Sequence, residues 1–315
     1  MQGYALAALA TGLVLVFWPC VLAGAGESGL PAGPAVVIRE GDRPLFEYRH
    51  ADVPFKPYVK QFFTPAGVNV LRDAPHDHLH HHALMFAVGI DGVDFWSEAK
   101  ECGRQVHRDA ELFGTVRGGQ AAVDGLRDEH LAWNTPAGET LAMEAREVRA
   151  HDGRELGASL LTWRTALKPA QGKASIKVHG SHYFGLGMRL VESMDNVGTF
   201  VAADANDPGE TVRGDERLRR GRWCAYTAPV DGKPVTVAMF DHPKNPRPAW
   251  WFTMTKPFAY LSATLNLHRE PLIVKADETL LLRYGVAAWD GGVDAKRIDD
   301  LYARWLALVD KAEKP

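Results

Sequence analysis

The sequence predicts a mainly β protein, a large antiparallel β-sandwich with one α-helix at its carboxyl end. Three observations support this prediction. Several segments alternate apolar and polar residues with the period of a strand, Asp-Gly pairs typical of tight hairpins recur along the chain, and one helical pattern closes it. Many strands joined by tight turns favour an antiparallel sandwich or barrel over βαβ units. We expect residues 35–315 to form a single domain of this kind.

The clearest strand pattern covers residues 105–117, with Val106 on the apolar face and Gln105 on the polar face. Further segments are rich in β-forming residues, namely 139–150, 235–240, 260–267 and 279–289. We expect hairpin turns at four Asp-Gly pairs, which are Asp91-Gly92, Asp124-Gly125, Asp152-Gly153 and Asp231-Gly232.

A helix is expected over residues 294–312. Asp294 is a suitable N-cap, because its carboxylate can accept a hydrogen bond from a free backbone N–H group of the first turn. The apolar residues recur at spacings of three and four, which places them on one helix face that we expect to pack on the sandwich. These residues are Ile298, Leu301, Trp305, Leu306 and Val309.

The amino-terminal segment 1–25 is predicted to be a signal peptide. Residues 5–18 are almost continuously apolar, and Ala23-Gly24-Ala25 fits the small-x-small rule of a cleavage site. A retained membrane anchor is the alternative. Segment 26–34 is rich in Gly and Pro and is expected to be a flexible lead-in. The protein is therefore expected to be exported to the periplasm or the extracellular space, with no membrane span after the signal peptide.

Charge and cysteine content narrow the classes of partner. The net charge of −3, with both signs mixed along the chain, argues against nucleic acid as the main partner and leaves a small molecule or glycan. Cys102 and Cys224 remain after export. They could form one disulfide in an oxidising compartment or stay free, and neither has a neighbouring cysteine that would indicate a zinc site.

A histidine-rich stretch, residues 76–82, is the main candidate site. Five of its seven residues are histidine, in a chain that contains 13. In a strand, two imidazoles at i and i+2 face the same way, so His78 and His80 could bind a divalent metal ion such as zinc or iron. Without a metal, imidazole and carboxylate groups together suit acid–base catalysis. A surface loop with incidental metal affinity is the third interpretation.

The apolar run 84–90 that follows this stretch predicts a buried strand, which would anchor the histidines at the mouth of the fold. We expect the working residues to be Asp77, His78, His80 and His81. His76 and His82 are expected to be peripheral.

Three further segments, 94–98, 179–189 and 241–251, combine titratable groups with aromatic residues or glycines. Carboxylates beside aromatic rings are typical of carbohydrate sites, and glycines allow a close approach to the backbone. Prolines would make the third segment a rigid loop. The candidate residues in these segments are Trp96, Glu98, His182, Arg189, Asp241, His242, Arg247 and Trp251.

Five motifs together resemble a bacterial family labelled PmoA-like, or "methane oxygenase PmoA". They are Asp77-His78-x-His80-His81, Asp94-Phe95-Trp96, Gly185-Leu186-Gly187-Met188-Arg189, Phe240-Asp241-His242-Pro243 with Asn245 and Arg247, and Arg283-Tyr284. The resemblance extends from about Phe55 to Trp305. His82 and Ala83 stand where that family more often has Arg or His, and Gly.

The resemblance implies a secreted β-sandwich similar to the large mutarotase-like sandwiches that act on sugars. It does not imply membrane methane oxidation. A particulate methane monooxygenase subunit spans the membrane with several helices, whereas this chain has one apolar amino-terminal segment and then strand-like alternation.

We therefore expect an exported carbohydrate-active enzyme that performs acid–base chemistry, whether hydrolysis, elimination or epimerisation, on a sugar. Two alternatives remain, an iron-dependent oxygenase with two His and one carboxylate as ligands, and a non-catalytic glycan-binding protein. The predicted catalytic residues are Asp77, His78, His80, His81, Glu98, His182, Asp241 and His242. The predicted substrate-binding residues are Trp96, Arg189, Arg247 and Trp251.

Overall fold

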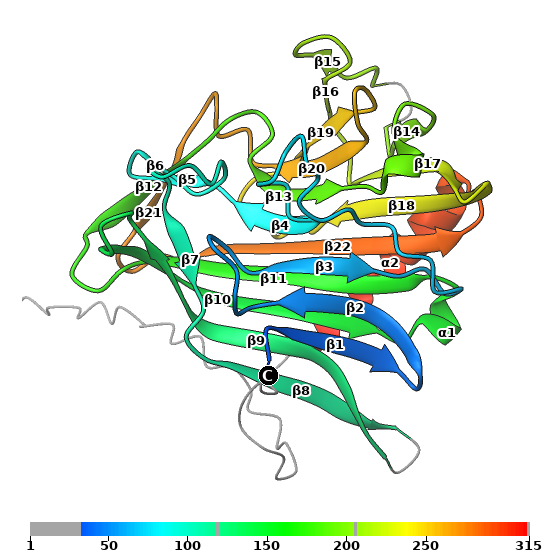
Figure 1. The fold of residues 1–315 in the computed structure, drawn as a ribbon, viewed down its shortest axis with the longest axis horizontal. Helices are drawn as coiled ribbons and strands as arrows, with labels where there is room; N and C mark the ends of the chain where they lie inside the picture. Colours follow the sequence, from blue (N-terminus) through cyan, green and yellow to red (C-terminus); the bar gives the residue numbers. More distant parts are fainter. Residues whose placement is uncertain (1–32, 118–119, 205–206, 314–315) are drawn as a thin grey trace, which may run out of the picture.

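The computed structural model describes residues 33–117, 120–204 and 207–313. The predicted signal peptide and almost all of the predicted lead-in lie outside the described residues. The described chain forms two large antiparallel sheets and one small one, as the sequence predicted (Figure 1). Among the described residues, no helix combines the length and the apolar character needed to cross a membrane.

The first sheet carries the histidine-rich stretch on the chain that enters β4. Its nine strands run in the order β1-β2-β3-β4-β13-β20-β19-β16-β15. Their bounds are β1 Ala35–Glu40, β2 Arg43–Arg49, β3 Tyr58–Phe62, β4 Leu84–Ala87, β13 Gly185–Arg189, β20 Tyr260–Thr264, β19 Trp250–Met254, β16 Arg217–Arg219 and β15 Glu210–Thr211.

The second sheet lies behind the first in Figure 1 and has the order β14-β17-β18-β22-β11-β10-β9-β7, with β8 also paired to β9. The bounds are β14 Thr199–Ala202, β17 Trp223–Val230, β18 Lys233–Asp241, β22 Leu280–Asp290, β11 Ser159–Pro169, β10 Thr140–His151, β9 Gln120–Asn134, β7 Arg104–Val106 and β8 Ala110–Arg117. A small sheet comprises β21 Leu272–Lys275, β12 Ser175–His179, β5 Gly89–Ile90 and β6 Val93–Asp94.

Both faces of the second sheet are covered, which explains why its central strands are buried along almost their whole length. On β22, Val286 and Ala288 belong to the core shared with the first sheet, whereas Ala287 and Trp289 belong to a second cluster. That second cluster is closed by α2, Ala295–Ala312, on the far side of the sheet (Figure 1). Alternation along one strand thus supplies two apolar layers.

The predicted C-terminal helix is confirmed. Asp294 is the N-cap, and its side chain accepts a hydrogen bond from Arg297 N at 2.8 Å. The predicted apolar face packs on the second sheet, and Trp305 also donates its indole N–H to Thr162 Oγ1 of β11 at 2.9 Å. Two short helical turns complete the fold, α1 at Gly153–Leu156 and η1 at Glu192–Met194.

The strand prediction over residues 105–117 is wrong in one respect, because residues 107–109 separate β7 from β8. The assignment of faces at its start is also reversed, since Gln105 is 3% exposed and Val106 is 39% exposed. The reason is a polar interior at this point. Gln105 donates to Phe86 O at 2.8 Å and accepts from Arg146 at 2.8 Å.

Two of the four predicted Asp-Gly turns are hairpins. Asp91-Gly92 joins β5 to β6 and Asp231-Gly232 joins β17 to β18, with positive φ at all four residues. Asp152-Gly153 instead leads into α1. Asp124-Gly125 lies within β9, where a Cβ on Gly125 would sit 2.3 Å from Val148 O. Gly125 therefore allows β9 and β10 to approach closely, and it does not form a turn.

Both cysteines that remain after the predicted cleavage are buried and free, so they do not form a disulfide in this structure.

Candidate functional site

The histidine-rich stretch forms consecutive turns and not a strand. His78 N donates to Pro75 O, and His81 N donates to His78 O, each at 2.9 Å. The expectation that alternate histidines share one face is therefore wrong. Instead, the imidazole rings of His78, His80 and His81 gather, with ring centroids 4.5–5.7 Å apart. His82 points away from them.

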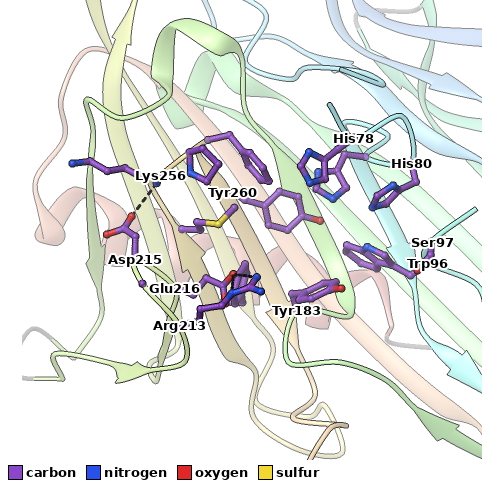
Figure 2. Close-up of a pocket in the computed structure, with 16 residues that line it drawn as sticks. His78, His80, Trp96, Ser97, Tyr183, Arg213, Asp215, Glu216, Lys256 and Tyr260 are labelled. Carbon is purple, nitrogen blue, oxygen red and sulfur yellow. Dashed lines mark hydrogen bonds and ion pairs between the residues drawn. The ribbon is translucent and has the colours of Figure 1, made fainter. Parts of the chain in front are cut away.

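The three gathered rings line one end of a cavity of about 590 Å³, here called the first cavity (Figure 2). Tyr260 of β20 lies between the histidine end and the opposite end, which is formed by the turn between β15 and β16. Five of the sixteen lining residues are aromatic, and such rings suit a site that holds a ring-shaped ligand. The aromatic lining residues are Trp96, Tyr183, Phe252, Phe258 and Tyr260.

Two of the histidines of the first cavity, His80 and His81, are held neutral. Burial, together with the smaller effects of the neighbouring His80, His78 and Arg189, lowers the pKa of His81 to about 2. Burial also lowers the pKa of His80. Both imidazoles are therefore uncharged at neutral pH, so each has one nitrogen lone pair that can accept a proton.

Several buried polar atoms of the cavity wall have no hydrogen-bond partner among the described residues. They are His81 Nδ1, Trp96 Nε1 and Tyr260 Oη. Burial raises the pKa of Tyr260 well above 10, so its hydroxyl stays protonated at neutral pH. Buried polar atoms normally have partners, and a polar ligand in the cavity would supply them.

The sequence prediction missed Glu216, which forms part of the opposite end of the cavity. Its carboxylate lies 2.6 Å from Arg213 Nη2 and 3.3 Å from His182 Nε2. His182, predicted to be catalytic, does not line the cavity and instead backs this carboxylate. Glu216 lies in a turn between two short strands, where no local motif marks it.

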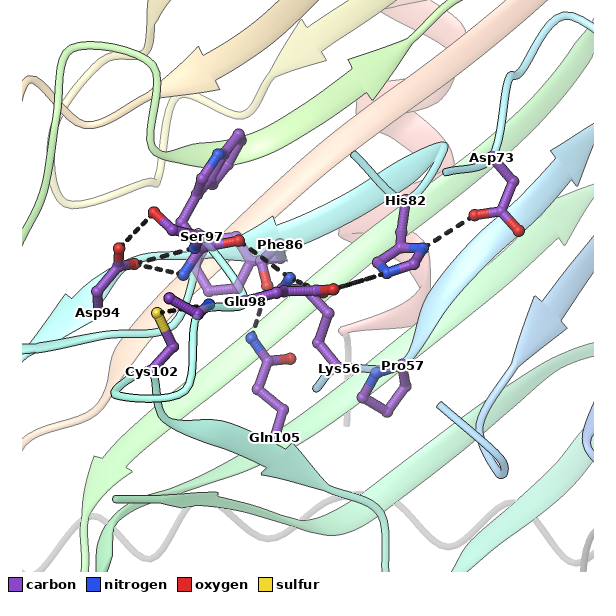
Figure 3. Close-up of polar contacts among 12 residues, drawn as sticks. Lys56, Pro57, Asp73, His82, Phe86, Asp94, Ser97, Glu98, Cys102 and Gln105 are labelled. Atoms are coloured by element: carbon purple, nitrogen blue, oxygen red, sulfur yellow. Dashed lines mark hydrogen bonds and ion pairs between the residues drawn. The ribbon is translucent and has the colours of Figure 1, made fainter. Parts of the chain in front are cut away.

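A buried network lies behind the histidine end of the cavity (Figure 3). His82 bridges two carboxylates, with Nδ1 2.9 Å from Asp73 Oδ1 and Nε2 3.1 Å from Glu98 Oε2. Glu98 also pairs with Lys56, whose Nζ donates to Trp96 O at 3.1 Å. Tyr58 Oη donates to Asp73 Oδ2 at 2.8 Å. This network fixes the backbone on both sides of the cavity-lining histidines and at Trp96.

Electrostatics within this network favour the charged form of His82. Burial opposes that charge, but the hydrogen bonds to Asp73 and Glu98 outweigh burial and raise the pKa of His82. Burial likewise raises the pKa of Glu98, but His82 and Lys56 outweigh it, so the net shift is downward. His82 is thus central to the site's support, contrary to the expectation that it is peripheral.

Two non-glycine residues beside the site adopt left-handed backbone conformations, Ala83 with φ of 42° and Glu98 with φ of 58°. Such conformations are unfavourable for residues with a Cβ and persist where surrounding contacts hold them. Glycine adopts such a conformation without this cost, so the backbone at Ala83 is one that would favour Gly.

Asp77 and Arg189 lie next to the first cavity but do not line it. Asp77 Oδ2 lies 3.1 Å from His78 Nδ1 and 3.8 Å from Arg189 Nη2. The Arg189 guanidinium is buried and stacks on the Phe258 ring, 3.5 Å from its centroid. The predicted role of Arg189 in holding a ligand carboxylate does not fit this placement, because Phe258 lines the cavity and Arg189 does not.

Asp241, His242 and Arg247 line a different cavity of about 600 Å³, here called the second cavity, which shares no lining residue with the first. Asp241 organises the loop after β18, accepting from Asn245 Nδ2 at 2.7 Å and from Ala249 N at 2.9 Å. The residues predicted to be catalytic therefore divide between two places.

The predicted substrate-binding role of Trp251 does not fit the structure. Its side chain is 0% exposed, and its indole N–H donates to Gly221 O at 2.7 Å. The neighbouring Trp250 lines the second cavity instead. Successive residues of a strand point to opposite faces, so the sequence pair Trp250-Trp251 offers one ring to each side.

The pH dependence of stability tests the environment of Asp241. Burial raises the pKa of Asp241 from 3.8 to about 6, although its hydrogen bonds lower it. Between these values the folded protein keeps a proton that the unfolded chain has lost. The free energy of unfolding should therefore fall by roughly 3 kcal/mol from this group as pH rises through that window. Urea unfolding at pH 4 to 7 should show a flatter profile for Asp241→Asn, and parallel profiles would contradict this assignment.

The predicted metal ligands His78 and His80 have ring centroids 5.7 Å apart. Among the residues that the structure describes, no group of three or more His, Cys, Asp or Glu has an arrangement that could hold a metal ion. A zinc or iron site stays a prediction, and metal analysis of protein purified without a tag tests it.

Comparisons with known proteins give a family but no named activity. One solved structure, described as "a putative aldose 1-epimerase" from Klebsiella pneumoniae subsp. pneumoniae MGH 78578, is similar over 64% of this chain, with 9% identity and a TM-score of 0.23. The match spans 65% of that structure's length, and a score this low supports no argument about activity. No curated protein matches the chain. The model of one family matches residues 35–303, and the chain thus belongs to the Family of unknown function (DUF6807).

Proposed function

We propose that this protein is a carbohydrate-active enzyme that performs acid–base chemistry on a sugar in the first cavity. The observation that carries the proposal is the pair of neutral imidazoles, half-buried His80 and buried His81, at one end of a cavity that five aromatic residues help to line. A neutral imidazole is a competent general base near pH 7. Aromatic faces pack against the C–H faces of sugar rings, and unpaired polar atoms bond their hydroxyls.

The geometry suggests a role for each group. His80, the less buried of the two, would accept a proton from the substrate, because a pKa of about 2 makes His81 too weak a base. The buried, unpaired Nδ1 of His81 would accept a hydrogen bond from a substrate hydroxyl. The Tyr260 hydroxyl and the Trp96 indole N–H would donate hydrogen bonds to substrate oxygens. Glu216, at the opposite end, would act as the second acid–base group on the other side of the ring.

The carboxylates of the first cavity favour epimerisation or elimination over hydrolysis. Glycoside hydrolysis commonly uses two carboxylates that flank the scissile bond. Asp215, the other carboxylate in the lining, accepts backbone hydrogen bonds from Thr255 N at 2.7 Å and Lys256 N at 3.0 Å. Asp215 thus holds the backbone at Thr255 and Lys256. Glu216 is then the carboxylate of the lining that could act with a histidine as the acid–base pair.

The test is turnover of a panel of neutral and acidic sugars, followed by ¹H NMR in D₂O for C–H exchange, anomer interconversion and unsaturated products. For a sugar that the parent protein converts, His80→Ala should lower kcat/KM by about 100-fold or more, the usual contribution of a general base. His76→Ala is the matched control, since His76 belongs to the same stretch, is exposed and does not line the cavity.

Full turnover by both His80→Ala and His81→Ala would contradict the proposal. If binding survived loss of these histidines but required Trp96, the glycan-binding alternative would be correct. Stoichiometric iron with oxygen-dependent turnover would identify the oxygenase alternative. Export to the periplasm or the extracellular space and membership of the PmoA-like family stay predictions alongside this proposal.

A further inference from the structure

The second cavity is not used by the proposed function, although it contains residues that the sequence singles out. It lies where the loop after β18 meets the chain before β17 and the helix α2, and Arg220, Trp250 and Tyr302 are among its lining residues. Because it shares no lining residue with the first cavity, a ligand bound there would be recognised independently.

Arg220 is the cation of this cavity whose donors are free. Its guanidinium stacks over the Trp250 ring, 4.3 Å from the centroid, and makes no hydrogen bond or ion pair with any described residue. The other two arginines of the lining already have hydrogen-bond or ion-pair partners within the protein. Arg222 pairs with Asp299, and Arg247 Nη1 donates to two backbone carbonyls. A guanidinium that lies over an indole keeps N–H donors free at its edge, and two of these can bind the two oxygens of a carboxylate.

Two buried polar atoms of the same lining also have no partner among the described residues, His242 Nε2 and Asn266 Oδ1. His242 Nδ1 accepts from Lys244 N at 3.2 Å, so in the neutral ring the proton lies on Nε2 and makes it a donor. Asp310 Oδ1 is 3.9 Å from that nitrogen, beyond hydrogen-bond distance. The lining therefore offers an unpaired donor and an unpaired acceptor as well as a free cation.

We propose that the second cavity is a binding site for a small polyol that carries a carboxylate, such as a uronic acid. Arg220 holds the carboxylate, while His242 and Asn266 pair with hydroxyl groups. A neutral sugar would leave Arg220 without a carboxylate partner. A simple carboxylate such as acetate would leave His242 and Asn266 without hydroxyl partners. The site is thus selective for a ligand that has both a carboxylate and hydroxyl groups.

Titration calorimetry with D-glucuronate, and with D-glucose and acetate as half-matched probes, tests this proposal. The binding that depends on Arg220 should be at least tenfold tighter for glucuronate than for either half-matched probe. Arg220→Ala should weaken glucuronate binding about tenfold or more, and Arg220→Lys should restore only part, because lysine keeps the charge but lacks the planar fork. Arg220 is exposed, so both variants should fold.

Arg213→Ala and His81→Ala are the controls, since both residues line the first cavity. Glucuronate affinity should be unchanged in both. A loss of affinity on Arg220→Ala that is equal for glucuronate and glucose, or full glucuronate binding by Arg220→Ala, would overturn the proposal. Loss of binding in either control would place the ligand in the first cavity and would also overturn it. Sugar turnover at the first cavity is measured separately, so its failure would leave this result intact.

Discussion

Replacing Glu144 with alanine is expected to lower the free energy of unfolding by about 3–5 kcal/mol. Glu144 and Arg146 of β10 are both fully buried between the sheets. The Glu144 carboxylate accepts from Arg146 Nε and Nη2 at 2.9 and 2.7 Å, from Trp133 Nε1 at 2.9 Å and from Thr165 Oγ1 at 2.8 Å. Its removal leaves a guanidinium in the core without a counter-charge.

The matched control is a surface pair. Lys296 and Asp300 form an exposed i,i+4 ion pair on α2, and Asp300→Ala should cost less than about 0.5 kcal/mol. The double variant Glu144→Leu/Arg146→Met should retain more stability than Glu144→Ala, because it removes both charges together. Urea unfolding at pH 7 measures all three. A Glu144→Ala effect as small as that of Asp300→Ala would contradict the structure at this point.

Replacing Glu98 with alanine is expected to have a comparable effect on stability and to remove activity as well. Lys56 is fully buried, and Glu98 is its only carboxylate partner within the described chain, so the variant leaves a buried ammonium with Trp96 O alone. The expected loss is about 3–5 kcal/mol. Because the same network fixes the backbone at Trp96 and beside His81, the first cavity should lose its shape too.

Lys56→Met is the informative comparison. It removes the ammonium but leaves the Glu98 carboxylate bonded to His82 at 3.1 Å, so no buried charge is left unpaired. Its unfolding free energy should fall by about 1–2 kcal/mol, clearly less than for Glu98→Ala. Unfolding by urea gives the stabilities, and kcat/KM on a converted sugar gives the activity. If Lys56→Met lowered the free energy of unfolding more than Glu98→Ala, the network would not depend on Glu98.

Local sequence patterns predicted much of the fold. The segments 139–150, 235–240 and 279–289 became β10, β18 and β22 with bounds shifted by one or two residues. The alternation of a strand and the spacing of a helix face depend on near neighbours in the chain, so they can be recognised without the tertiary structure. Asp124-Gly125 shows the limit, because a glycine needed for strand contact has the same local sequence as a hairpin turn.

The candidate site was predicted only in part. His78, His80, His81 and Trp96 do meet in one cavity, because three of them lie within four residues of one another and Trp96 follows soon after. The residues that were missed occur singly and without a motif, and tertiary contacts between distant segments bring them to the site. They are Tyr58, Lys56, Asp73, Glu216 and Tyr260.

The sequence by itself determined the antiparallel β class, the capped terminal helix and the histidine-rich stretch as the centre of the candidate site. Only the tertiary structure decided which histidines face the first cavity, that His82 instead bridges two carboxylates, and that Asp241 and His242 belong to a separate cavity. The physical reason is the separation along the chain of the residues that interact. Periodicity and capping involve residues a few positions apart, whereas burial, ion pairing and the pKa of an imidazole depend on groups that sheet order brings together from distant segments.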